Sequence, residues 1–232
     1  EEQRAYWVAP DLLAWPLSLL PRGTGRESVV SASGEPVPGA GLTLRLITAP
    51  DGGAAAVHGR ILGADGLPAP TITPLRIVGN LPRDVLDAHP HLEGYIALSL
   101  TDDDGTALLD DDAVAAALTG QVAVAQYADG GSGGPDGEGG PGNSGGGPDD
   151  PGHLDALTGV QTAILLDRLY AEAASRAELG VAFHAVDDGP GRPSFALWAP
   201  TARAVTLLTW ETGDPLGAVP EVPGPPVRTP AV

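Results

Sequence analysis

The sequence predicts a mainly β protein: an immunoglobulin-like β-sandwich domain, a Gly-rich linker, one connector helix and a truncated second β-sandwich. Short segments that alternate apolar and polar residues are the first indication, because strands repeat every two residues. The second is the content of turn residues, since 33 Gly and 24 Pro make up about a quarter of the 232 residues, against a usual share of roughly 12%. The third is a Gly-rich, acidic stretch that divides the chain.

The first part, residues 1–127, is expected to be the complete sandwich. Residues 6–8 and 12–15 flank a Pro-Asp turn signal and predict a hairpin. Helices are predicted where Pro82 provides a suitable first residue and where Asp110 to Asp112 place negative charge at a helix start. The predicted elements are strands at 42–47, 75–78, 95–100 and 121–127, and helices at 83–88 and 113–118.

The rest of the chain divides into three. Residues 128–152 hold no large apolar side chain and are predicted to be a flexible acidic Gly/Pro linker. Residues 153–180 are assigned to the connector helix, whose apolar stripe over about 162–178 has the period of an α-helix. Residues 181–232 are expected to form a partial sandwich, in which strands at 194–198 and 204–210 pair as a hairpin.

The charge excludes several classes of partner. The formal net charge is −18, with 30 acidic residues against 12 basic ones, all of them Arg. Nucleic acid and an anionic membrane are therefore poor partners, because both require a basic surface. A neutral glycan is compatible with this charge. The chain has no Cys, which excludes disulfides and thiolate sites, and no cofactor is predicted.

The four Trp residues are the candidates for sugar contact, because aromatic faces stack on the apolar faces of pyranose rings. Trp7, Trp15 and Trp198 lie on strand patterns, so a core role is the alternative for each. Trp210 ends a predicted strand and is less constrained.

A metal site is not predicted, although Asp102 and Asp104 partly match the middle of a calcium loop. Leu100 stands where the first Asp of such a loop belongs, and a solvated acidic turn is the competing interpretation. His89 and His91 are two residues apart without a third ligand, so we expect them to fix a turn.

Several blocks resemble one family. The segment FALWAPTARAVTLL (195–208) resembles the opening hairpin of family 48 carbohydrate-binding modules. The blocks AYWV (5–8), LAWP (13–16), HPHLEGYIAL (89–98), LTGQVAVA (118–125), TGVQ (158–161) and LDRLYA (166–171) resemble, in the same order, the N-terminal sandwich and connector of pullulanase-type α-1,6-glucosidases of glycoside hydrolase family 13.

The resemblance implies a non-catalytic N-terminal portion of a hydrolase that acts on α-1,6 branches of pullulan, starch or glycogen. The family's catalytic barrel has no counterpart in these residues, so no catalytic residue is assigned and the chain alone is expected to be inactive. The implied partners are an α-glucan and the barrel of the parent enzyme. The compartment, extracellular or cytoplasmic in a bacterium, stays open, and no signal peptide is found. The competing hypothesis is a free-standing α-glucan-binding or scaffold protein.

Overall fold

The chain divides into two units, Glu1–Ala177 and Glu178–Val232. The computed structural model describes residues 3–57, 60–128, 153–186, 189–209 and 227–230. The predicted linker at 128–152 lies outside the described residues, apart from Ala128 and its end of strand β8.

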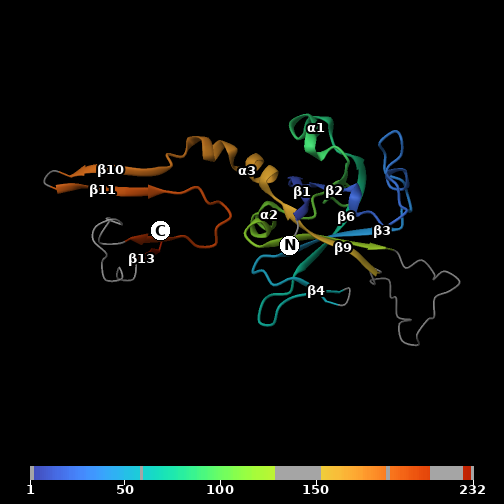
Figure 1. Ribbon diagram of the computed structural model, residues 1–232, viewed down its shortest axis with the longest axis horizontal. Helices are drawn as coiled ribbons and strands as arrows, with labels where there is room; N and C mark the ends of the chain where they lie inside the picture. The colour runs from blue at the N-terminus through green and yellow to red at the C-terminus, as the bar shows by residue number, and fades with distance from the viewer. Residues whose placement is uncertain (1–2, 58–59, 129–152, 187–188, 210–226, 231–232) are drawn as a thin grey trace, which may run out of the picture. The chain divides into compact units, whose positions relative to one another are not determined.

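The first unit is built mainly from strands, which confirms the predicted fold class (Figure 1). The strands are β1 (Gln3–Ala9), β2 (Leu12–Pro16), β3 (Leu42–Ala49), β4 (Ala55–Val57), β5 (Arg60–Leu62), β6 (Thr71–Asn80), β7 (Tyr95–Ser99), β8 (Gln121–Ala128) and β9 (His153–Gln161). All the strands predicted between residues 6 and 127 are present.

The helices of the first unit begin where the sequence indicates. They are α1 (Arg83–Ala88), α2 (Asp111–Leu118) and α3 (Ala163–Arg176), with short 3-10 turns at η1 (Leu17–Leu19), η2 (Arg26–Ser28) and η3 (Pro90–Leu92). Asp110 caps α2, since its carboxylate accepts a hydrogen bond of 2.8 Å from the backbone N–H of Ala113. Such a cap satisfies a donor that the first helical turn leaves open.

Residues 153–161, assigned above to the connector helix, form strand β9 before α3 begins. This strand pairs antiparallel with β8 and parallel with β1, so seven strands close into a barrel in the order β1-β2-β7-β6-β3-β8-β9. Closure removes the exposed strand edges that an open sheet leaves. The first unit therefore extends well beyond residue 127.

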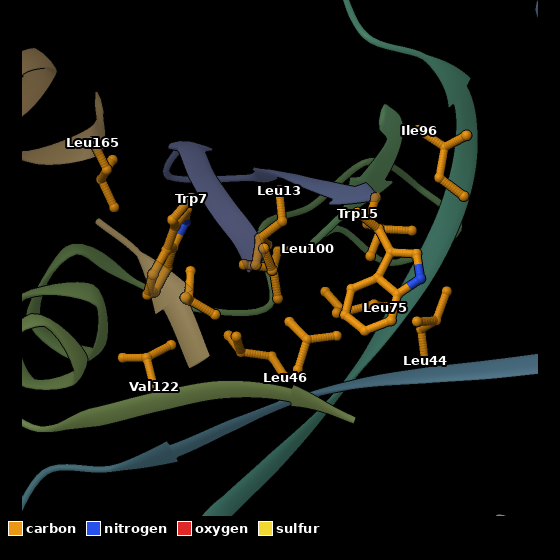
Figure 2. Packing of buried hydrophobic residues seen from close by; sticks show 14 of the residues in the cluster. Trp7, Leu13, Trp15, Leu44, Leu46, Leu75, Ile96, Leu100, Val122 and Leu165 are labelled. Carbon is orange, nitrogen blue, oxygen red and sulfur yellow. The ribbon is translucent and has the colours of Figure 1, made fainter. Parts of the chain in front are cut away.

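The core lies inside this barrel. Trp7 and Leu13 project from β1 and β2 toward Leu46 and Val122 on the opposite strands, and Leu165 of α3 lies at one end (Figure 2). These side chains come from alternate positions along each strand, as the pattern of alternation predicts. Burial of this apolar area stabilises the unit.

The outer faces of two barrel regions are covered as well. Outside β1, β2 and β7, Val8, Ala14 and Ala97 pack with Val85 of α1 and Leu92 of η3. A second cluster, outside β3 and β8, contains Ile47, Ala123, Ala125 and Tyr127.

The second unit contains paired strands: β10 (Gly180–Val186) with β11 (Gly189–Ala196), and β12 (Thr206–Thr209) with β13 (Val227–Pro230). The predicted hairpin between 194–198 and 204–210 is therefore wrong in its pairing. Phe195 lies opposite Val181 on β10 instead. The alternation of Val181 and Phe183 marks a strand that the sequence analysis did not include.

Within the described part of the chain, every helix falls short of the length and apolar character needed to cross a membrane.

Candidate functional site

Two of the four candidate Trp residues lie in the core. The side chains of Trp7 and Trp15 are 0% exposed. Trp15 Nε1 donates a hydrogen bond of 3.0 Å to Oε1 of Gln126, whose Nε2 donates to the backbone oxygen of Leu19 at 2.8 Å. Neither ring offers a face to a ligand, so the structure places both in the role that the core alternative describes.

The other two Trp residues belong to the second unit. Trp198 follows β11 and is 37% exposed, which leaves part of its ring open to solvent. Trp210 lies outside the described residues. Of the candidate Trp residues that the structure describes, Trp198 alone has part of its ring open to solvent.

The acidic residues at 102–104 form a tight turn. Asp102 Oδ1 accepts hydrogen bonds from the backbone N–H groups of Asp104 at 3.0 Å and Thr106 at 2.8 Å. Asp103 forms an ion pair of 3.1 Å with Arg76. This arrangement is an Asx turn, in which the carboxylate replaces a backbone acceptor. Among the described residues, no group of three or more His, Cys, Asp or Glu side chains is placed to hold a metal ion.

Four rings gather on the outside of the first unit, and we call them the aromatic surface: Tyr6, His89, His91 and Tyr95. The ring centroid of Tyr6 lies 5.3 Å from that of His91 and 5.7 Å from that of Tyr95. His89 and His91 are 5.9 Å apart. His91 is exposed, whereas the other three rings are half-buried. The surface is thus open to a ligand yet packed against the barrel.

Strand register brings these rings together. Tyr6 on β1 lies opposite Ala14 on β2, and Ala14 lies opposite Ala97 on β7. Tyr95 is two residues before Ala97 and therefore projects from the same outer face. Ala14, on the strand between β1 and β7, has a small side chain, so the two Tyr rings can contact each other across it.

The surroundings of Tyr95 affect the ionisation of its phenol. Burial raises the pKa of the Tyr95 phenol above its ordinary value; the neighbouring Tyr6 adds to this and Arg4 opposes it. The Tyr95 hydroxyl therefore remains protonated at neutral pH and can both donate and accept a hydrogen bond.

A groove of about 300 Å³ runs beside the aromatic surface. Its base is Val8 of β1, two residues from Tyr6 and on the same face of the strand. One wall comes from α1 and the other from α3, so the groove is part of the first unit. The remaining lining residues are Asp84, Val85, Ala88, His89, Ile164, Asp167 and Arg168.

The aromatic surface was not predicted from the sequence, in which the larger Trp rings are the more prominent candidates for sugar contact. Tyr6 precedes Trp7, and the two-residue repeat of a strand places them on opposite faces. If Trp7 is buried, Tyr6 and Val8 must point outward. That signal was present in the sequence, whereas the proximity of Tyr95 depends on pairing across three strands.

The first unit is a closed β barrel whose outer face carries the aromatic surface and the groove. The Pullulanase N2 domain family matches residues 2–133, more than half of the chain. The chain therefore belongs to this family.

Solved structures share the fold. The maltotriose complex of a PulA mutant from Klebsiella pneumoniae is 24% identical, with a TM-score of 0.53. Apo pullulanase from the same organism is also 24% identical, with a TM-score of 0.52. Each alignment covers 90% of this chain and 16% of the pullulanase chain. The chain thus spans about a sixth of the length of these structures. No curated protein matches the chain.

Proposed function

We propose that this chain is the non-catalytic N-terminal portion of a pullulanase-like glycoside hydrolase that acts on α-1,6 branches of α-glucans. In this role it packs on the catalytic barrel of its parent enzyme and helps to present branched substrate. The observation that carries the proposal is the match of residues 2–133 to the Pullulanase N2 domain. The shared fold with Klebsiella pullulanase over 90% of the chain supports it.

The domain division belongs to the same proposal. We assign residues 1–127 together with β9 to the N-terminal sandwich, residues 128–152 to the acidic linker and α3 to the connector helix. The second unit is assigned to a partial family 48 carbohydrate-binding module. The last assignment rests on the resemblance of residues 195–208 alone, because Phe195 pairs with Val181 of β10 and not with the 204–210 segment.

The acidic turn at residues 102–104 has a structural role. A retaining glycosidase needs two carboxyl groups about 5 Å apart across a sugar-sized cleft. Asp102 and Asp103, by contrast, serve a backbone turn and an ion pair with Arg76. We expect the purified chain to release no reducing sugar from pullulan. Release of reducing sugar would contradict the non-catalytic assignment.

The gene tests the other half of the proposal. We expect the nucleotide sequence downstream of the codon for Val232 to encode a glycoside hydrolase barrel in the same reading frame. A stop codon there, confirmed in the transcript, would contradict the proposal.

The second candidate is a free-standing α-glucan-binding or scaffold protein, and the aromatic surface is the observation that favours it. This candidate predicts binding of amylopectin by the chain together with a gene that encodes no barrel. The maltotriose bound in a related pullulanase structure makes an α-glucan the first ligand to test for both candidates.

A further inference from the structure

The groove and the aromatic surface are continuous, because His89 belongs to both. His89 lines the groove with α1 and α3, and its ring is 5.9 Å from His91. His91 leads to Tyr6 at 5.3 Å, and Tyr6 to Tyr95 at 5.7 Å. One path of rings therefore extends from the groove across the outer face of the barrel.

The polar groups of the groove suit a neutral ligand rich in hydroxyl groups. Asp84 and Asp167 supply carboxylate acceptors, and Arg168 supplies guanidinium donors from the same wall as Asp167. Sugar hydroxyls both donate and accept, so they can satisfy the two kinds of group at once. The ring faces add apolar contact for the C–H surface of a pyranose.

Charged ligands fit less well. An anion is opposed by the two groove carboxylates and by the formal net charge of −18 on the chain. A metal cation is disfavoured because the described residues offer no cluster of three metal-ligating side chains. The volume of about 300 Å³ lies at the lower end of the range for small-molecule sites, about 300–1,000 Å³. The groove can therefore hold a short part of a longer ligand that continues over the rings.

The orientation of the rings favours a curved chain. The planes of Tyr6 and Tyr95 meet at 78°, and those of Tyr6 and His91 at 59°. Consecutive sugar units of a straight, flat chain cannot stack on rings inclined in this way. An α-linked glucan, which bends between units, can contact them in turn.

We propose that the groove between α1 and α3, together with the aromatic surface, is a binding site for an α-glucan chain. The choice of α-glucan rests on the proposed function, whereas the preference for a neutral oligosaccharide rests on the groove itself. Tyr6 and His91 provide the stacking contacts, and Asp84, Asp167 and Arg168 bond the hydroxyl groups.

The test is an NMR titration of the full chain with maltoheptaose, with cellohexaose as the straight-chain comparison. We expect saturable shifts with a Kd of about 1 mM or tighter for maltoheptaose and weaker binding of cellohexaose. Tyr6→Leu and His91→Ala should each weaken maltoheptaose binding about tenfold, because a stacking contact is lost. Tyr6→Phe keeps the ring and should retain most of the affinity. His184→Ala, in the second unit, is the matched control and should bind as the unchanged chain does.

The binding of the variants decides whether the proposed site exists. Loss of binding in Tyr6→Leu and His91→Ala, with folded spectra and unchanged binding in Tyr6→Phe and His184→Ala, supports the site. Equal binding by all variants, or no binding by the unchanged chain, overturns it. Because His91 is exposed, its replacement tests the site even if Tyr6→Leu disturbs packing. The nucleotide sequence downstream of the codon for Val232 tests the proposed function independently of these binding results. The proposed function and the proposed site can therefore fail separately.

Discussion

The two units contain strands with the same alternation of residues, yet their apolar side chains lie in different environments. In the first unit Trp15 and Leu46 are 0% exposed, whereas in the second Phe183 and Phe195 are 75% and 52% exposed. Alternation defines an apolar face in both cases. Burial of that face requires a second layer, which barrel closure provides in the first unit. A sequence pattern therefore predicts a face more securely than it predicts a core.

The largest difference is expected for large apolar side chains. Trp15→Ala should lower the free energy of unfolding of the first unit by about 3–5 kcal/mol, because it leaves a cavity among close-packed side chains. Phe195→Ala in the second unit removes a ring that is 52% exposed and should cost less than about 1 kcal/mol. Urea unfolding followed by circular dichroism measures both. Equal costs would remove the distinction between the units.

Glycines with positive φ extend the comparison to the backbone. Gly79 on β6 has a φ of +112°, and an added Cβ would lie 2.1 Å from the backbone oxygen of Gly34. Gly180 on β10 has a φ of +101°, with nothing within 4 Å of an added Cβ. We expect Gly79→Ala to cost about 2 kcal/mol or more, and Gly180→Ala about 1 kcal/mol, since only the former adds a backbone clash to the conformational cost. Thermal melting of the two variants tests this order. A larger fall in melting temperature for Gly180→Ala than for Gly79→Ala would contradict it.

Polar groups should show a smaller contrast. Gln126→Leu leaves the buried Nε1 of Trp15 without its acceptor and should cost about 1–3 kcal/mol. In the second unit, Ser194 Oγ lies 2.8 Å from Nε2 of His184 in an exposed pair. Ser194→Ala should change the free energy of unfolding by no more than about 0.5 kcal/mol, because water can replace the lost partner. Urea unfolding of both variants is the measurement. A loss of unfolding free energy in Ser194→Ala as large as that in Gln126→Leu would contradict the proposed difference in solvent access between the two pairs.

The smallest effect is expected at alkaline pH and only in the first unit, because the second contains no Tyr. Burial raises the pKa of the Tyr127 phenol above its ordinary value, with Arg45 acting in the opposite direction. The folded state then keeps this proton to a higher pH than the unfolded state does. The protonated Tyr127 phenol therefore contributes fully to the stability of the folded state below about pH 10. This contribution is lost as the pH rises through the pKa of the folded state. We expect the melting temperature to fall above pH 10, and less steeply in Tyr127→Phe; identical pH profiles would contradict the assignment.

Much of the fold could be predicted from local sequence. The Pro10-Asp11 turn, the cap at Asp110 and the alternation along β3 and β8 all specify local conformation, and each is present. Barrel closure could not be predicted in this way. It depends on the pairing of Tyr6 with Gln161, residues far apart in the chain whose contact has no local signature.

The candidate site shows the same limit. The outward direction of Tyr6 follows from the strand repeat once Trp7 is assigned to the core. The neighbours of Tyr6 cannot be predicted in the same way. Tyr95 lies beside Tyr6 only because of the registers in which β1 pairs with β2 and β2 pairs with β7. The groove needs one further contact, the packing of α3 against β1. The outward direction of a single side chain was therefore predictable from the sequence, whereas the assembly of several side chains into a site was not.

The central claim, that the first unit contacts an α-glucan through the face formed by α1, η3 and α3, has one direct test. It is hydrogen exchange of the full chain with and without saturating maltoheptaose, resolved by peptide. We predict slower exchange at residues 84–92 and 163–168, with no change in the β10–β11 hairpin. Protection confined to the second unit, or none anywhere at saturation, would contradict the claim.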